Sequence, residues 1–70
     1  MATEHDKQLG RHIQTLRQKI GLRQEDLAEK VQLSAKYIQF IETGHRVPSL
    51  KTLYKIANAL KVKVSELFPF

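Results

Sequence analysis

One segment of the chain predicts two short helices joined by a tight turn: residues 23–44, with the sequence RQEDLAEKVQLSAKYIQFIETG. The first helix is indicated by Leu27, Ala28 and Val31, which recur at the spacings of an amphipathic helix, and we expect it to end near Val31. Helices of about two turns are unstable alone, because nucleation is costly and short helices depend on tertiary packing. The rest of the chain must therefore hold this pair of helices in place.

The second helix of the pair is expected at about residues 35–43. Ser34 is a favourable N-cap, because its hydroxyl can accept a hydrogen bond from a free backbone amide of the first turn. Ile38 and Ile41 supply the buried face, and Gly44 is expected to end the helix as a left-handed C-cap. A period of 3.6 residues turns the remaining side chains of this helix outward.

Three further helical segments are expected around this pair. Thr3 and Asp6 form a capping-box pattern that opens a helix running to about Ile20, and Ser49 and Ser65 are expected to cap a fourth helix and a last single turn. The expected buried residues are Leu9, Ile13, Leu16 and Ile20 in the first helix, Leu50, Leu53, Ile56, Ala57 and Leu60 in the fourth, and Leu67 and Phe68 in the last turn. The pattern predicts an all-α fold of five helices.

Length and composition limit how this fold is stabilised. Seventy residues suffice for one small domain, which we place at residues 1–70 with a core from about 9 to 68. The chain has no cysteine, so neither a disulfide nor a thiolate metal site can stabilise it. Helix packing must supply the stability.

The charge of the chain is unevenly distributed. The net charge is +5, and between Lys30 and Ser65 seven Lys or Arg residues accompany a single acid, Glu42. This imbalance favours a polyanionic partner, although such values also occur on ordinary solvated surfaces. No apolar run approaches the roughly 20 residues of a membrane span. No signal peptide is evident either, so we expect a cytoplasmic protein with no membrane partner.

Neither a metal site nor a catalytic site is expected. His5 and His12 lie on the first predicted helix, but no carboxylate at ligand spacing completes a metal site. The sequence contains no nucleophile elbow and no glycine-rich phosphate loop, and 70 residues leave little room for a substrate cleft. We therefore expect no enzyme activity, no cofactor, no metal and no small-molecule ligand.

Residues from about 9 to 68 resemble the helix-turn-helix domain of the lambda-repressor/Cro-like family, also called the Xre family. The resemblance is carried by Gln24, Leu27, Ala28, Leu33, Ser34, Ile38, Ile41, Glu42, Gly44, Pro48, Ser49 and Leu50. Two positions depart from the pattern, because Gln32 and Lys61 stand where the family commonly has glycine. If the backbone of Gln32 is left-handed, the conformational penalty for a residue with a Cβ is roughly 1 kcal/mol, which packing can offset.

The resemblance implies a compact five-helix lambda-repressor-like DNA-binding domain, with the helix-turn-helix formed by its second and third helices. It also implies a sequence-specific double-stranded DNA-binding regulator of transcription, and it favours a repressor of prokaryotic or phage type, associated with the nucleoid when bound. The alternative is a protein-interaction module or the DNA-binding subunit of an antitoxin.

In this motif the second helix lies in the major groove and its N-terminal residues reach base edges. We expect Lys36 to donate to guanine, Gln39 to make paired hydrogen bonds with adenine, and Ala35 to touch a thymine methyl group. Phe40 lies at the border of this outward face. It is either a core residue or an apolar contact with thymine methyl groups or a sugar.

Phosphate contacts are expected from helix N-termini and from the loop after the second motif helix. The candidate residues are Arg23, Gln24, Tyr37, Thr43, His45, Arg46 and Lys51. Tyr37 either packs beside the turn or donates its hydroxyl to a phosphate. Lys36 and Lys51 each lie in the first turn of a helix, and neither turn contains an acid. Their positive charges oppose the helix dipole, which costs roughly 0.3 to 1 kcal/mol each. A neighbouring phosphate would remove this conflict.

The family resemblance also implies an ion pair between Arg17 and Glu42. By position alone, Arg17 follows the expected core residue Leu16 and would be a surface arginine. Paired with Glu42, it would fix the recognition helix against the scaffold, so breaking the pair should lower stability and binding together.

We further expect a homodimer on an inverted-repeat operator, because one recognition helix reads too few base pairs to select a site in a genome. The expected contact is formed by Leu67, Phe68 and Phe70. Leu67 and Phe68 can also close the core, but Phe70 follows a helix-breaking proline and has no obvious place inside one domain. The alternative is that Phe70 folds back on its own domain.

Overall fold

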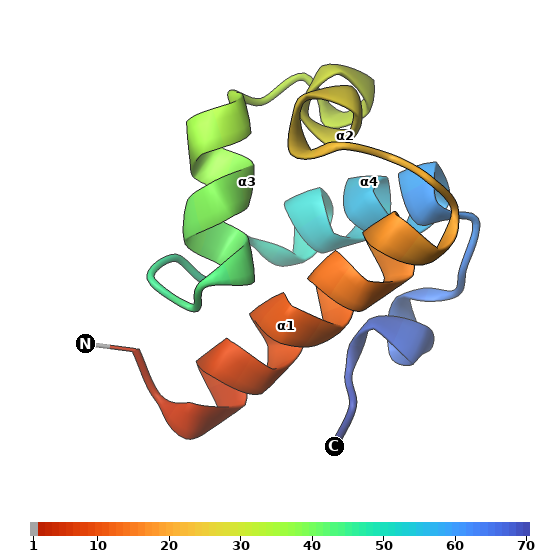
Figure 1. Cartoon of the computed structure of the whole chain (residues 1–70). Helices are drawn as coiled ribbons and strands as arrows, with labels where there is room; N and C mark the ends of the chain where they lie inside the picture. Colours follow the sequence, from red (N-terminus) through yellow and green to blue (C-terminus); the bar gives the residue numbers. More distant parts are fainter. Residues whose placement is uncertain (1) are drawn as a thin grey trace.

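A computed structural model describes residues 2–70 and contains, within that range, only helical elements (Figure 1). They are α1 (Glu4–Lys19), α2 (Gln24–Val31), α3 (Ala35–Glu42), α4 (Leu50–Leu60) and the 3₁₀ turn η1 (Val64–Leu67). The predicted all-α class and the order of five elements are confirmed, with the last element a 3₁₀ turn.

The ends of α1 are fixed by local hydrogen bonds. Thr3 and Asp6 form the predicted capping box: the Asp6 N–H donates to Thr3 Oγ1 at 3.1 Å, and the Thr3 N–H donates to Asp6 Oδ2 at 3.0 Å. At the other end Gly21 is left-handed, with φ +77°, and the Leu22 N–H donates to the Arg17 carbonyl at 3.1 Å. This C-cap turns the chain towards α2.

The turn between α2 and α3 has the conformation that a helix-turn-helix requires. Gln32 is left-handed with φ +60°, and the Leu33 N–H donates to the Ala28 carbonyl at 2.9 Å. Ser34 then caps α3, because its Oγ accepts from the Tyr37 N–H at 3.1 Å. The predicted turn and cap are confirmed, and Gln32 adopts the left-handed conformation despite its Cβ.

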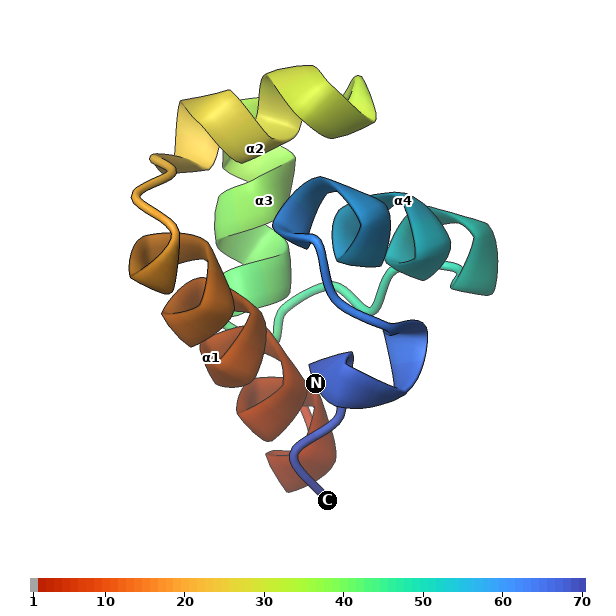
Figure 2. The same cartoon turned by 90° about the vertical axis from the view of Figure 1, so that its right-hand side faces the viewer.

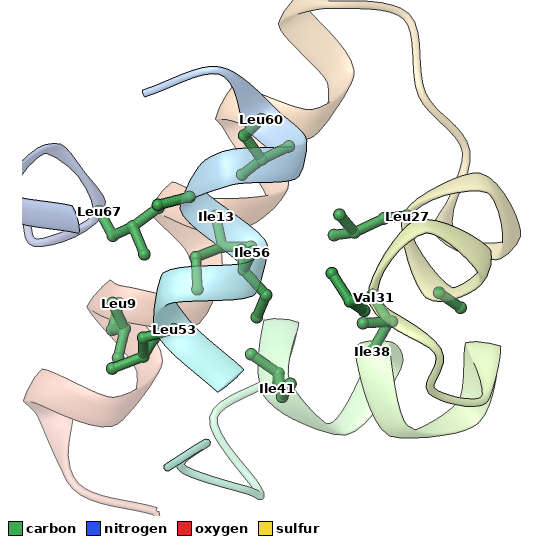
Figure 3. Close-up of a cluster of buried hydrophobic side chains, with 12 residues drawn as sticks. Leu9, Ile13, Leu27, Val31, Ile38, Ile41, Leu53, Ile56, Leu60 and Leu67 are labelled. Carbon is green, nitrogen blue, oxygen red and sulfur yellow. The ribbon is translucent and has the colours of Figure 1, made fainter. Parts of the chain in front are cut away.

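All five elements contribute side chains to one hydrophobic core (Figure 3). Its buried members are Leu9, Ile13, Leu27, Ala28, Val31, Ile38, Ile41, Leu53, Ile56, Ala57, Leu60 and Leu67. Full burial of one large aliphatic side chain contributes roughly 1.5 to 3 kcal/mol, so this cluster is what stabilises the two short motif helices.

Three sequence expectations about these elements are wrong. Ile20 is 44% exposed, because α1 ends at Lys19 and the buried stripe continues from Ile13 to Arg17 instead. Leu50 is 60% exposed because α4 meets the core only from Leu53 onwards.

The third concerns the last turn. Ser65 does not cap it, because η1 begins at Val64 and Ser65 is already its second residue. The N-cap residue is Lys63, whose N–H donates to the Glu66 carboxylate at 2.7 Å.

The helices are arranged so that α3 is supported from several sides. Figure 1 shows α1 passing below the lower end of α3. Figure 2 shows α2 across the upper end of α3, and η1 next to both α4 and α1. On the left of Figure 1, α3 faces no other element. Within residues 2–70, no helix has the length and apolar character needed to cross a bilayer.

Candidate nucleic-acid interface

The exposed side of α3 carries the three side chains expected to meet base edges. Ala35, Lys36 and Gln39 are all exposed, whereas Ile38 and Ile41 on the opposite side are 1% exposed each. The helix is therefore held by its apolar side and presents a short polar strip to the outside. The first turn of α3 contains no acidic residue, so the positive end of its dipole is not compensated by a carboxylate there.

Phe40 lies at the edge of this strip and is half-buried. It belongs neither to the hydrophobic core nor to the half-buried side chains packed against that core among the described residues. Its ring centroid lies 5.9 Å from Lys36 Nζ and 6.4 Å from the centroid of the His45 ring. Phe40 is therefore not a core residue, which was the first of the two roles that the sequence left open.

Thr43 and His45 form a small hydrogen-bonded unit just beyond α3. Thr43 Oγ1 lies 3.0 Å from the Gln39 carbonyl oxygen and 2.8 Å from His45 Nδ1. When the threonine hydroxyl donates to the carbonyl, it accepts from Nδ1–H, which leaves His45 Nε2 as the free ring nitrogen. Gly44, between them, is left-handed with φ +84° and ends α3 as predicted.

A buried ionic network fixes the end of α3 to two other elements. Arg17 and Glu42 are 6% exposed each, and Arg17 Nε lies 2.6 Å from Glu42 Oε2. Arg17 Nη2 donates to Glu42 Oε1 at 3.1 Å, Gln24 Nε2 donates to the same oxygen at 3.0 Å, and Arg17 Nη1 donates to the Leu22 carbonyl at 2.7 Å. The structure thus brings together Arg17 and Glu42, and it places the Gln24 side chain on Glu42.

The geometry of this network favours a structural role for it. Removing one partner would leave a charge buried without compensation, which is strongly destabilising. Glu42 also lies at the C-terminal end of α3, where a carboxylate opposes the helix dipole, and the Arg17 guanidinium offsets that conflict. Within residues 2–70, every buried side-chain nitrogen and oxygen has a hydrogen-bond partner.

The start of α2 is organised by Arg23 and Asp26. The Arg23 N–H donates to Asp26 Oδ2 at 2.8 Å, and the Arg23 guanidinium lies 3.2 Å from the same oxygen. The hydrogen bond from the Arg23 side chain, and then the one from its backbone, hold the pKa of Asp26 below its usual value, while Asp26 and Glu25 raise the pKa of Arg23. Arg23 is thus exposed but already engaged with acids.

The remaining phosphate candidates lie on the surface around α3. Arg46 and Lys51 are exposed, and Tyr37 is half-buried and packed against the core. Lys51 lies in the first turn of α4, which contains no acidic residue. Backbone amides at that end are available to an anion together with the lysine.

Gly10 is a scaffold residue that the sequence pattern did not single out. It is buried on α1, and a Cβ at this position would collide with the carbonyl oxygen of Ile41 and lie 2.7 Å from that of Glu42. The backbones of α1 and α3 therefore touch where α3 ends. The available signal was a glycine beside Leu9 inside an otherwise regular helix, since such a glycine costs roughly 0.5 to 1 kcal/mol relative to alanine.

The predicted dimer residues differ in their accessibility. Leu67 is fully buried in the domain core, so it has no surface to offer to a partner, and its assignment to an interface is corrected. Phe68 is half-buried. The Phe70 ring stacks on His5 at 4.3 Å and lies edge-on to Phe68 at 6.1 Å between centroids, so it folds back on its own domain, as the alternative predicted, while 59% of Phe70 stays exposed. Residues 2–70 contain no group of three His, Asp or Glu side chains placed to hold a metal ion.

Comparison with known proteins identifies a matching family model and several relatives. A family model described as Helix-turn-helix matches residues 13–67. An uncharacterised HTH-type transcriptional regulator from Archaeoglobus fulgidus is 41% identical over 58 residues, which are 83% of this chain and 83% of that protein. The immunity repressor protein of Bacillus phage phi105 is 41% identical over 59 residues, which are 84% of this chain and 41% of that protein.

Two solved structures have the same fold at comparable identity. The restriction-modification controller protein C.AhdI from Aeromonas hydrophila superposes with a TM-score of 0.86 at 37% identity, over 89% of this chain and 94% of that one. SinR, a master regulator for biofilm formation solved in complex with DNA, superposes with a TM-score of 0.79 at 32% identity, over 84% of this chain and 95% of that one. The chain belongs to the Xre-like helix-turn-helix family HTH_3.

Proposed function

We propose that this chain is a sequence-specific DNA-binding regulator of transcription that inserts α3 into the major groove. The observation that carries the proposal is the exposed polar side of α3, held rigidly by its apolar side and by the Arg17–Glu42 pair. The similarity to SinR, whose structure contains DNA, supports duplex DNA as the partner. The similarity to a phage immunity repressor favours repression. We place this activity in the cytoplasm and within a single domain.

Base reading and phosphate binding fall to different side chains in this proposal. Lys36, in the first turn of α3, and Gln39, about one turn later, are both exposed, so they specify the sequence by hydrogen bonds to base edges. Arg46 and Lys51, in the loop after α3 and at the start of α4, contact phosphates and position the domain. Gln24, at the start of α2, contacts a phosphate through its backbone N–H, because its side chain already donates to Glu42.

The working form on DNA in this proposal is a homodimer. Phe70 is 59% exposed and lines an open hollow of about 430 Å³. The other residues that line the hollow are Gln8, Arg11, His12, Thr15 and Pro69. In a two-fold dimer each protomer offers the same patch, so Phe70 of one copy can enter the hollow of the other. The two recognition helices then enter successive major grooves about 34 Å apart on an inverted repeat.

Titration of DNA tests the dimer. The intact protein should bind an inverted-repeat duplex cooperatively with two protomers and a single half-site more weakly, and Phe70→Ala should lose the cooperativity. Cooperative binding unchanged by Phe70→Ala would remove Phe70 from the interface. A preferred site without two-fold symmetry would contradict the dimer itself.

The alternative function, docking on another protein, makes a different prediction about salt. If α3 binds duplex DNA through several phosphate contacts, the logarithm of the binding constant should fall linearly with the logarithm of salt concentration, by roughly 0.9 for each neutralised phosphate. The measurement is a fluorescence-anisotropy titration of a random-sequence duplex at several salt concentrations. Absence of binding at low salt would favour a protein-interaction module.

A further inference from the structure

The exposed side of α3 has a hollow at the edge of which an aromatic side chain lies. An open hollow of about 360 Å³ is lined by Lys36, Gln39, Phe40, Thr43 and His45. Four of these side chains are exposed, and the half-buried ring of Phe40 is the only aromatic carbon surface that α3 itself contributes to the hollow. The apolar ring therefore lies within the surface that the proposed function assigns to base edges.

The Phe40 ring is held in place from two directions. Lys36, one turn earlier on α3, places its ammonium 5.9 Å from the ring centroid, within the range of a cation–π contact. The His45 ring lies 6.4 Å away at a tilt of 55°, and it is itself fixed by the hydrogen bond between Nδ1 and Thr43 Oγ1 at 2.8 Å. The hollow thus combines an apolar surface of defined orientation with a cationic donor at its rim.

The major-groove edge of thymine matches this combination. Thymine presents its C5-methyl group beside the O4 acceptor, whereas cytosine presents an N4 amino donor and no methyl group. An aromatic ring is a favourable surface for the methyl group, and the Lys36 ammonium can donate to an acceptor beside it, either O4 of the same thymine or O6 of a neighbouring guanine. We propose that the Phe40 hollow receives the 5-methyl group of one thymine in each operator half-site, an inference that rests on the proposed DNA-binding function.

The experiment removes the methyl group from the DNA and leaves the protein unchanged. A preferred site is first selected from random duplexes, and each of its thymines is then replaced singly by deoxyuridine. At one position in each half-site the dissociation constant should rise about fourfold, the value expected when one methyl group is no longer removed from water. A duplex that tolerates deoxyuridine at every position would overturn the proposal.

Protein variants assign the effect to Phe40. Phe40→Ala should weaken binding to the unmodified site and abolish the difference between thymine and deoxyuridine at that position, whereas Phe40→Leu should retain part of it. Tyr54→Ala is the matched control, since Tyr54 is an aromatic residue 58% exposed on α4, and it should leave the difference intact. A difference that persists in Phe40→Ala, with the variant shown to be folded by its thermal unfolding, would also overturn the proposal.

A 5-methylcytosine–guanine pair at the sensitive position separates the methyl group from O4. Binding about fourfold tighter than to the unmethylated cytosine pair would support the methyl contact. Equal binding to the two cytosine pairs would contradict it. All these outcomes leave DNA binding itself intact, whereas failure to select any preferred sequence would overturn the proposed function and this inference with it.

Discussion

Glu42 is the one acid that this basic chain buries within residues 2–70, and its three hydrogen bonds explain where it lies. Two come from Arg17 and one from Gln24, so a single carboxylate connects α1, the start of α2 and the end of α3. Because α3 is only 8 residues long, its orientation depends on such contacts at its ends as well as on its buried isoleucines. The pair positions the recognition helix without touching DNA in our proposal.

The Arg17–Glu42 pair can be tested by a double-mutant cycle. Arg17→Ala and Glu42→Ala should each lower the free energy of unfolding by roughly 3 to 5 kcal/mol, because each leaves an uncompensated buried charge. The loss of unfolding free energy in the double variant should be smaller than the sum of the two single losses, by roughly 0.5 to 3 kcal/mol. Urea unfolding in a stabilising osmolyte keeps the single variants measurable. Additive losses would show that the two side chains are not coupled.

Gly10 is expected to accept alanine poorly. Gly10→Ala gains up to about 1 kcal/mol of helix propensity. It also places a Cβ against the Ile41 and Glu42 carbonyl oxygens, and overpacking of this kind costs roughly 1 to 3 kcal/mol. We therefore expect net destabilisation in thermal unfolding and weaker DNA binding, since α3 must move.

Gly21→Ala is the matched control for this change. Gly21 has φ +77°, and a Cβ added there would meet no atom within 4 Å beyond its chain neighbours. Alanine at this position should therefore cost only the left-handed strain, roughly 1 kcal/mol, and leave DNA affinity unchanged. A Gly10→Ala variant at least as stable as the parent would contradict the close contact between α1 and α3.

At the scale of the element, α2 carries a pH-dependent contribution to stability through Asp26. Its pKa is lowered in the folded state, so its stabilising effect is fully present above the unfolded value and is lost as the pH falls through the folded value. Asp26→Asn keeps an acceptor oxygen for the Arg23 N–H but removes the charge. The melting temperature of Asp26→Asn should therefore lie below that of the parent at neutral pH, and the difference should begin to shrink below pH 3.8, the ordinary pKa of aspartate, and close as the pH falls through the lower folded pKa. A difference in melting temperature that does not change with pH would show that the charge of Asp26 is not the cause.

The division of roles between α3 and the following loop predicts two kinds of binding defect. Gln39→Ala should cost roughly 1 to 3 kcal/mol on the preferred site and little on random DNA, because its target is a base edge. Arg46→Ala should weaken binding to both DNAs and reduce the salt slope by roughly one, because its target is a phosphate. Equal losses on both DNAs for Gln39→Ala would refute its assignment.

Local sequence signals predicted most of the helix ends correctly. Thr3, Ser34 and Ser49 accept the expected capping hydrogen bonds, because a cap depends on residues three positions away. The burial of Ile20 and Leu50 was predicted incorrectly, since it depends on where a neighbouring element lies and not on the helix period alone.

Contacts between distant elements were harder to predict. The close approach at Gly10 joins residues more than 30 positions apart, so a glycine inside a helix can signal a close contact but does not indicate its partner. Arg17 and Glu42 are 25 positions apart, and periodicity alone placed Arg17 on the surface. Only the family resemblance suggested their pairing. Of the candidate site, the outward residues of α3 followed from the period of the helix, whereas the ring contacts of Phe40 with Lys36 and His45 required the structure.

At the scale of the whole molecule, the charge of the chain favours a polyanionic partner. The net charge is +5, and the acid-free first turns of α3 and α4 belong to the elements that flank the loop carrying His45 and Arg46. Such a surface attracts duplex DNA of any sequence, and the side chains of α3 add the discrimination between sequences. The core, formed by all five elements, holds this surface in one geometry (Figure 3).

The central claim, that duplex DNA meets the exposed side of α3, can be tested directly by nuclear magnetic resonance of the 8.1 kDa chain. The measurement is the change in backbone amide and side-chain shifts when a selected duplex is added at low salt. We predict the largest changes at Lys36, Gln39 and Phe40, with further changes at Arg46 and Lys51 and at the start of α2. Binding that leaves the resonances of α3 unchanged would contradict the account.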